Sequence, residues 1–291
     1  MNFSDLLQFV LTGVTNGAIY GTIGIGFVVI HRITGVINFA IGDLALVGAF
    51  AAVVLAEALP LWLAVLGGIA IAALVSMASY WLAIRPLSRH HLLVQLIATL
   101  GVAIAVRSLL QILFGSGAYQ LPPFVSGPPL SVGGATISRQ ALWVIALSVI
   151  IVGLLILFFD WTLLGKAVTA CAVNPFAARV VGINTGLMAA LSFALAGAAA
   201  GTVTIAQTPM SVVTVLGGLT LSLKGFVAAI LGGVDKIGLT LVGGIIVGLI
   251  ESATAIFAGA LYATLAALVM MLVLLIFRPA GLTRLRTATR V

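Results

Sequence analysis

Long apolar runs, separated by short polar segments, recur from one end of this sequence to the other. Hydrophobic residues make up 63% of the 291 residues, charged residues make up 7%, and the mean hydropathy is +1.34. Because a soluble domain carries about 25% charged residues, this chain could not cover a surface that faces water. The composition predicts an all-α protein that crosses a lipid bilayer repeatedly and forms one transmembrane domain over residues 1–291.

The apolar runs are long enough for about eight or nine membrane-spanning helices of roughly 20 residues each. They cover residues 9–30, 36–58, 61–84, 92–114, 140–159, 187–207, 212–233, 238–257 and 260–277. The run at 212–233 is the least regular, because the stretch TPMSVVTVLGGLT at 208–220, where it starts, is rich in Thr, Ser and Gly and contains Pro209. It either crosses as a ninth span or is a broken or re-entrant segment, which would lower the count to eight.

Basic residues lie almost entirely on one side of the predicted membrane. With nine crossings, one side holds Arg32, Arg85, Arg89, Lys166, Arg179, Lys236, Arg278, Arg284, Arg286 and Arg290, and the opposite side holds Arg139. Loops rich in Lys and Arg stay in the cytoplasm. The distribution predicts an external N-terminus and a cytoplasmic C-terminus, and it accounts for the formal net charge of +7 without a nucleic-acid partner.

Two connecting segments are long enough to have structure of their own. Residues 115–139 are predicted to be external, and their four prolines exclude one continuous helix. Residues 160–186 are predicted to be cytoplasmic and helical in two pieces, with Asn174 as an N-cap and Pro175 as the first residue of the second piece. A short amphipathic helix at this place usually lies on the membrane surface.

Glycines spaced by four residues mark several of the predicted spans. The rows are Gly13, Gly17 and Gly21, then Gly197 and Gly201, then Gly244 and Gly248. Small residues at this spacing let helix backbones approach closely. We expect these rows to pack helices within one bundle rather than to form a dimer face.

The sequence contains no set of residues typical of an enzyme. The Gly165-Lys166 pair lacks the upstream glycine and the following Ser or Thr of a phosphate-binding loop, so we expect no ATP hydrolysis by this chain. His90 and His91 fit a basic interface better than a metal site. The single cysteine, Cys171, excludes an internal disulfide and a multi-cysteine metal site. We therefore expect no catalytic residues, metal or cofactor.

Polar residues inside the predicted spans are the candidate functional residues. They are Asn16, Asn38, Asp43, Arg107, Lys224 and Glu251. Ionisable groups at membrane depth face the bundle interior or a water-filled path. They either line a solute pathway or pair to hold helices together. Lys224 has Asp43 and Glu251 as possible partners, and Arg107 has the same two.

Four stretches carry a family resemblance that extends over nearly the whole chain. They are GVINFAIGDLALVGAF at 35–50, RPLSRHHLLVQLIATLG at 85–101, GKAVTACAVNPFAARVVGIN at 165–184 and KGFVAAILGGVDKIGLTLVGGIIVGLIES at 224–252. In this order they resemble the LivH-type permease of bacterial ABC importers for branched-chain amino acids. The chain departs from the family pattern at Ile41, where members often have His, and at Arg107, where we expect an uncharged residue.

The resemblance implies the partners and the place of this chain in the cell. It implies a subunit of the bacterial cytoplasmic membrane that pairs with a LivM-type permease, two ATPase subunits and a periplasmic solute-binding protein. The cytoplasmic segment would then hold a coupling helix that docks into an ATPase. The residues it implies for coupling are Gly165, Lys166, Ala170, Asn174, Pro175, Arg179 and Gly182.

The solute and the class of transporter remain open at this stage. The resemblance implies a branched-chain amino acid, and the departures from the pattern leave room for another amino acid, an amide or urea. The alternative from another class is a self-contained secondary transporter or channel, which would function without partners. A membrane-embedded enzyme is the least favoured reading, because the sequence offers no catalytic set.

Overall fold

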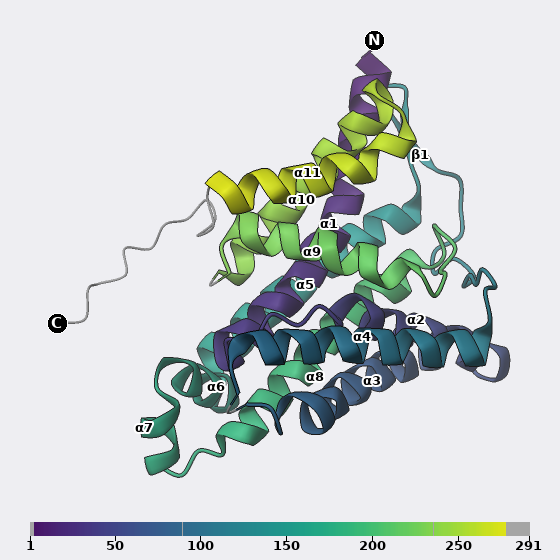
Figure 1. The fold of residues 1–291 in the computed structure, drawn as a ribbon. Helices are drawn as coiled ribbons and strands as arrows, with labels where there is room; N and C mark the ends of the chain where they lie inside the picture. Colours follow the sequence, from purple (N-terminus) through teal and green to yellow (C-terminus); the bar gives the residue numbers. More distant parts are fainter. Residues whose placement is uncertain (1–2, 89, 235, 278–291) are drawn as a thin grey trace.

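The structure, a computed structural model, describes residues 3–88, 90–234 and 236–277, and these form a bundle of helices (Figure 1). The elements are α1 (Phe3–Thr34), α2 (Ile41–Ala58), α3 (Leu61–Ser79), the π-helical turn η1 (Tyr80–Ile84), α4 (Leu92–Phe114), β1 (Leu130–Val132), β2 (Ala135–Ile137), α5 (Arg139–Trp161), α6 (Leu163–Val173), α7 (Pro175–Val180), α8 (Thr185–Gln207), α9 (Gly217–Gly232), α10 (Ile237–Phe257) and α11 (Ala260–Phe277).

Most of the helices in the described part of the chain are long and apolar enough to cross a membrane. Seven meet this description by length and composition, namely α1, α2, α3 continued by η1, α4, α5, α8 and α10. The predicted all-α, multi-pass membrane architecture is confirmed. α9 is shorter, at 16 residues, and α11 adds an apolar helix of 18 residues.

The long helix α1 runs through the centre of the bundle. Its 32 residues correspond to about 48 Å of helix, which is longer than the ~30 Å hydrocarbon layer. α1 packs most extensively against α10 and also contacts α8 and α9. Figure 1 shows it crossing the molecule diagonally beside these helices, with its N-terminal end projecting beyond them.

Glycine rows make the closest helix contacts in the bundle. A β-carbon at Gly17 would overlap the backbone of Ile245 and Gly244 on α10, and one at Gly248 would overlap Gly13 and Gly17 on α1. Gly197 of α8 lies in the same way against the backbone of α3. The prediction that these rows pack helices within one chain is confirmed.

Two of the predicted spans begin with non-helical backbone. α2 begins at Ile41 rather than at residue 36, after an irregular segment at 35–40 that the sequence did not predict. α9 begins at Gly217 rather than at 212, which confirms the irregular start expected there. A bridge between Tyr119 and Val213 ties the segment before α9 to the 115–138 loop. At its other end α9 leads into the turn before α10, and whether this stretch crosses the membrane or re-enters stays a prediction.

Three basic residues predicted for one side of the membrane, Arg32, Arg85 and Arg179, lie at the same end of the bundle. Arg32 stacks on Phe159 near the end of α5, and Arg85 and Arg179 line one pocket. Arg139 lies at the opposite end, at the start of α5. Arg89, Arg278, Arg284, Arg286 and Arg290 lie outside the described residues, so the side of the C-terminus stays a prediction.

We expect the substitution Gly17→Ala to destabilise the protein, because its methyl group would overlap the α10 backbone. Overpacking of this kind costs about 1–3 kcal/mol in free energy of unfolding. Gly153→Ala on α5 is the matched control, since nothing lies within 4 Å of a β-carbon there. Thermal unfolding of the two variants in detergent, followed by size-exclusion chromatography, measures the difference. Equal stability of the two variants would contradict the close α1–α10 contact.

Candidate functional site

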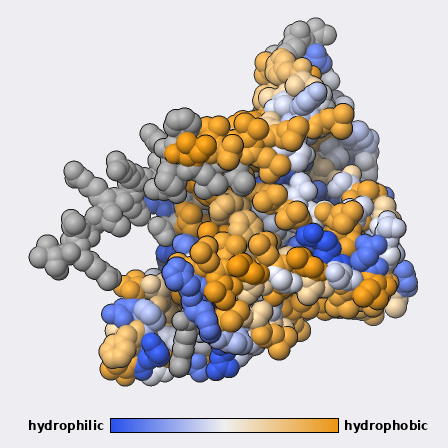
Figure 2. Space-filling view, viewed as in Figure 1, coloured by the Kyte–Doolittle hydropathy of each residue, from blue (hydrophilic) through white to orange (hydrophobic). Residues whose placement is uncertain are grey.

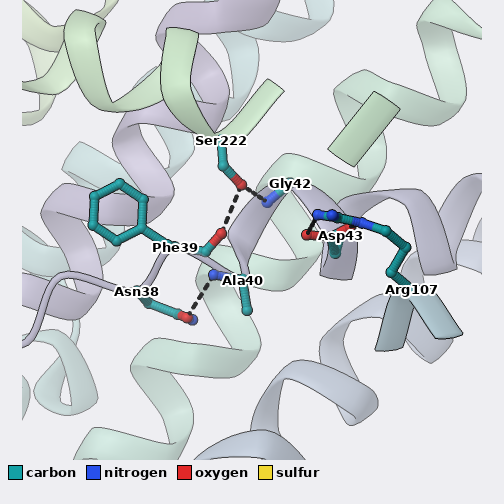
Figure 3. A network of polar contacts seen from close by, with 7 residues as sticks. All are labelled: Asn38, Phe39, Ala40, Gly42, Asp43, Arg107 and Ser222. Carbon is teal, nitrogen blue, oxygen red and sulfur yellow. Dashed lines mark hydrogen bonds and ion pairs between the residues drawn. The ribbon is translucent and has the colours of Figure 1, made fainter. Parts of the chain in front are cut away.

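The irregular segment before α2 is held inside the bundle by hydroxyl groups from two other helices, of which Figure 3 shows that of Ser222. The Phe39 N–H donates to Thr99 Oγ1 of α4 over 3.3 Å. Ser222 Oγ of α9 donates to the Phe39 carbonyl over 2.8 Å and accepts from the Gly42 N–H over 2.9 Å. Water is absent from the hydrocarbon layer, so broken backbone at this depth needs such partners. These side chains allow α2 to begin deep within the protein.

Asp43 and Arg107 form an ion pair directly beside this break (Figure 3). Arg107 Nε donates to Asp43 Oδ1 over 3.0 Å, and Arg107 Nη2 donates to Oδ2 over 2.9 Å. Two parallel bonds of this kind are the strongest arginine–carboxylate geometry. Asp43 also lies in the first turn of α2, where the helix dipole favours a negative charge. A β-carbon at Gly218 of α9 would overlap the Asp43 carboxylate, so no side chain fits there.

The two members of this pair differ in exposure. The Asp43 side chain is fully buried, whereas 23% of the Arg107 side chain is exposed. Arg107 lines a pocket of about 660 Å³ between α4 and the segment that precedes α9. The pocket is also lined by Ser108, Gln111, Ile112, Thr214 and Leu216. The guanidinium group therefore borders the pocket, whereas the carboxylate is buried and does not.

Lys224 and Glu251 form a second ion pair within the bundle. Lys224 Nζ donates to Glu251 Oε1 over 2.7 Å and to the Tyr20 hydroxyl over 3.1 Å. The side chains of Lys224 and Glu251 are 8% and 13% exposed. The pair joins α9 to α10, and Tyr20 extends the contact to α1. This arrangement explains how a lysine is accommodated in an apolar span.

The structure chooses among the pairings that the sequence left open. Arg107 pairs with Asp43, and Lys224 pairs with Glu251. The alternative pairing of Asp43 with Lys224 is wrong. Among the described residues no hydrogen bond or ion pair joins one pair to the other, so the four charges form two separate neutral pairs rather than one cluster.

The two predicted amides lie in different places. Asn38 is buried in the break before α2, where its Oδ1 accepts from the Ala40 N–H over 3.1 Å (Figure 3). Its Nδ2 has no hydrogen-bond partner among the described residues. Asn16 instead lines a smaller pocket of about 150 Å³ beside the β-hairpin, with Thr136 and Gln8. Asn16 is therefore not grouped with the other candidates.

Ile41, the departure from the family pattern, is fully buried. A β-carbon at Gly26 of α1 would lie 2.9 Å from Ile41 Cγ1, so the isoleucine fills the space left by that glycine. Its surroundings belong to the main apolar core. The apolar residue therefore suits its position as a packing residue.

Sequence reasoning missed the hydroxyl residues that complete the site. Ser222, Thr99 and Tyr20 each contact a segment distant in the sequence. The only signal was a hydroxyl group within an apolar span. That signal is weak, because most such residues bond a carbonyl of their own helix, as Thr22 does with Ala18.

The segment predicted to be cytoplasmic forms two short helices, α6 and α7, with the predicted caps at the start of α7. Asn174 Oδ1 accepts from the N–H groups of Phe176 and Ala177 over 3.1 and 3.0 Å, and Pro175 is the first residue of α7. Gly182 has a positive φ of 86° and ends the turn after α7. In Figure 1 α7 projects from the end of the bundle rather than lying along it.

Most residues predicted for coupling are accessible on this projecting segment. Those exposed are Lys166, Ala170, Asn174, Pro175, Arg179 and Gly182. Gly165 is buried, because it packs against the Phe158 carbonyl where a β-carbon would overlap. Gly165 therefore sets the angle between α5 and α6. Beside the exposed residues, Phe176, Val180 and Val181 leave at least 70% of their surface uncovered.

The fold and the sequence both have recognisable relatives. The permease protein LivH of the high-affinity branched-chain amino acid transport system of Salmonella typhimurium is 27% identical over 96% of each chain. The corresponding permease protein BraD of Pseudomonas aeruginosa is 28% identical over 95% of each chain. Among solved structures, PsaBC from Streptococcus pneumoniae in complex with Fab aligns with a TM-score of 0.52. That alignment covers 96% of this chain and 94% of the other at 13% identity, so it shows likeness of fold alone.

A family model described as the permease component of the branched-chain amino acid transport system matches residues 9–277. The match includes both buried ion pairs, the break before α2 and the projecting α6–α7 segment. The chain is a multi-pass membrane protein that belongs to the family of branched-chain amino acid transport system permease components.

Proposed function

We propose that this chain is one permease subunit of an ABC importer that moves branched-chain amino acids, or a related small polar solute, into the cytoplasm. Its partners would be a second, LivM-type permease, two ATPase subunits and a periplasmic solute-binding protein. Membership of the family, and the branched-chain amino acid transport permeases among its relatives, support the transport role. The location would be the bacterial cytoplasmic membrane, with the C-terminus in the cytoplasm.

The observation that carries the proposal is the partly exposed Arg107 on an apolar face. Arg107 lies seven residues before the end of α4, which places it about 10 Å along the helix from that end. Its exposed neighbours on α4 include Ile104 and Ile112, and Figure 2 shows a polar patch between α4 and α9 within a largely apolar surface. An arginine facing lipid at the bilayer centre costs roughly 2.5–3.5 kcal/mol. A second permease subunit that covers this face would remove the cost and enclose a polar path.

The projecting segment supports a separate source of energy. α7 offers exposed apolar side chains at the end of the bundle where the basic residues gather. A pocket of about 590 Å³, lined by Arg85, Arg179 and Asn184, lies at its base. An ATPase docked on α7 would convert its closure into a rigid-body movement of the attached helices. In this proposal the ATPases bind and use the ATP, and the permease itself has no catalytic site and no cofactor.

Co-purification with the products of neighbouring genes tests the proposal. We expect two ATPase subunits and a second permease to co-purify with this chain. We also expect a solute-binding protein loaded with solute to stimulate ATP hydrolysis by the complex in lipid. A stable chain recovered alone that transports solute without ATP would overturn the proposal. That result would favour a self-contained secondary transporter or channel.

Phe176→Ser tests the role of α7. Phe176 is 70% exposed, so its loss leaves the bundle intact but removes apolar surface from the contact with the ATPase. We expect recovery of the ATPase subunits and solute-stimulated hydrolysis to fall about tenfold, the effect of losing one central interface aromatic. Phe257→Ser is the matched control, because Phe257 is 73% exposed and is the last residue of α10, outside the α6–α7 segment. If both variants couple normally, α7 is not the docking helix.

The proposed pathway residues are Asn16, Asn38, Asp43, Arg107, Lys224 and Glu251, and the Lys224–Glu251 pair can be tested as a unit. Lys224→Met alone leaves a buried carboxylate without its partner, so we expect loss of assembled protein, at about 3–5 kcal/mol. The double variant Lys224→Met/Glu251→Gln removes both charges, and we expect it to assemble. Uptake by the assembled double variant then decides the role. Normal uptake would remove this pair from the pathway, whereas reduced uptake with normal assembly would support it.

A further inference from the structure

Arg107 has hydrogen-bonding capacity that its ion pair leaves unused. A guanidinium group carries five N–H donors. The two bonds to Asp43 use Nε and one donor of Nη2. The pair is bidentate, so the guanidinium plane is already oriented before any ligand arrives, which lowers the entropy cost of binding. The exposed part of the side chain borders the pocket between α4 and the segment before α9.

The pocket exposes the positively charged member of the Asp43–Arg107 pair. Asp43 is fully buried behind the guanidinium, and no acidic residue is among the described residues that line the pocket. An uncharged ligand, such as urea or an amide, would accept hydrogen bonds from the guanidinium but would carry no charge to attract it. A carboxylate would add that ionic attraction, and its two oxygens can accept from the guanidinium together.

The rest of the lining matches the remainder of a small amino acid. Ser108, Gln111 and Thr214 carry hydroxyl and amide oxygens that can accept from an ammonium group. Ile112 and Leu216 are apolar and suit a short branched tail. A volume of about 660 Å³ lies within the usual range for small-molecule sites.

We propose that this pocket binds solutes that carry a carboxylate and a short apolar tail, and that Arg107 distinguishes them from neutral amides and urea. The inference rests on the proposed transport function, because it names the solute class that passes this face. Arg107 receives the carboxylate without leaving Asp43, and the second permease subunit closes the pocket over the solute.

Thiol protection in the assembled transporter tests the pocket directly. Ser108→Cys places an exposed thiol in the pocket lining, in a Cys171→Ala background. The native Cys171 is an unsuitable reporter, because burial raises the pKa of its thiol and a protonated thiol reacts slowly. The probes are 4-methylpentanoate and 4-methylpentanamide, which differ in the carboxylate alone. Acetate at the same concentration tests the contribution of the tail.

We expect 4-methylpentanoate to slow modification of the new thiol about tenfold more than the amide does, because the carboxylate adds an ionic attraction to the fixed guanidinium. Acetate should protect less than 4-methylpentanoate. Equal protection by the acid and the amide in this background would overturn the proposal without any further variant. Equal protection by acetate and 4-methylpentanoate would overturn the part of the proposal that concerns the tail.

Removal of the cation gives the second arm of the test. Arg107→Gln alone leaves Asp43 charged and buried, so the variant used is Asp43→Asn/Arg107→Gln, which keeps hydrogen-bonding side chains at both positions. We expect it to assemble and to lose the preference for the acid. Arg139→Gln is the control, because this arginine lies at the same end of the bundle and bonds the Pro128 carbonyl instead. A preference that survives in the double variant, or disappears in Arg139→Gln, would contradict a role for Arg107.

The result is separable from the test of the transport function. Protection is measured without ATP, in the complex or, if the chain is recovered alone, in the chain reconstituted in lipid. Failure of ATP-driven uptake would overturn the importer and leave the protection result to decide the pocket. Normal uptake with equal protection by acid and amide would overturn the pocket and leave the importer standing.

Discussion

Every backbone polar group at membrane depth must find a partner within the protein, and this constraint shapes the centre of the molecule. The chain is non-helical at 35–40 and at 208–216, and each of these segments leaves backbone groups without partners in a helix. Ser222 and Thr99 supply the missing partners at the first break. The bridge between Tyr119 and Val213 supplies them at the second. Because the partners come from different helices, the breaks also fasten α2, α4 and α9 together.

The start of α2 then becomes the most polar point in the bundle. Its dipole favours the carboxylate of Asp43, and the carboxylate in turn requires a cation. Arg107 meets that need from α4, a helix that otherwise packs mainly against α2 and η1. The ion pair therefore does two things at once. It neutralises a buried acid, and it holds the wall of the pocket in place with part of the guanidinium group facing outward.

The bundle has a closely packed region, where glycines bring helix backbones together, and a less buried region at α4. The glycine contacts between α1 and α10, and between α8 and α3, bring backbones together over long faces. Close packing of this kind transmits force without deforming. The Lys224–Glu251 pair and Tyr20 lie in this region, joining α9, α10 and α1. The pocket at Arg107 lies outside it, beside the less buried α4, and the α6–α7 segment projects from one end.

The sequence by itself determined the all-α membrane architecture, the bounds of most helices, the caps of α7 and the six polar residues within spans. These follow from local properties, namely hydropathy over some 20 residues, glycine spacing and the chemistry of Asn174 and Pro175. Only the tertiary structure decided that Asp43 pairs with Arg107 rather than Lys224, that α2 begins at Ile41, and that Ser222 and Thr99 complete the break. These contacts join residues about 60 to 180 positions apart, and hydropathy carries no record of which helices meet. The physical reason is that pairing energy depends on distance and burial, which exist only once the helices have packed.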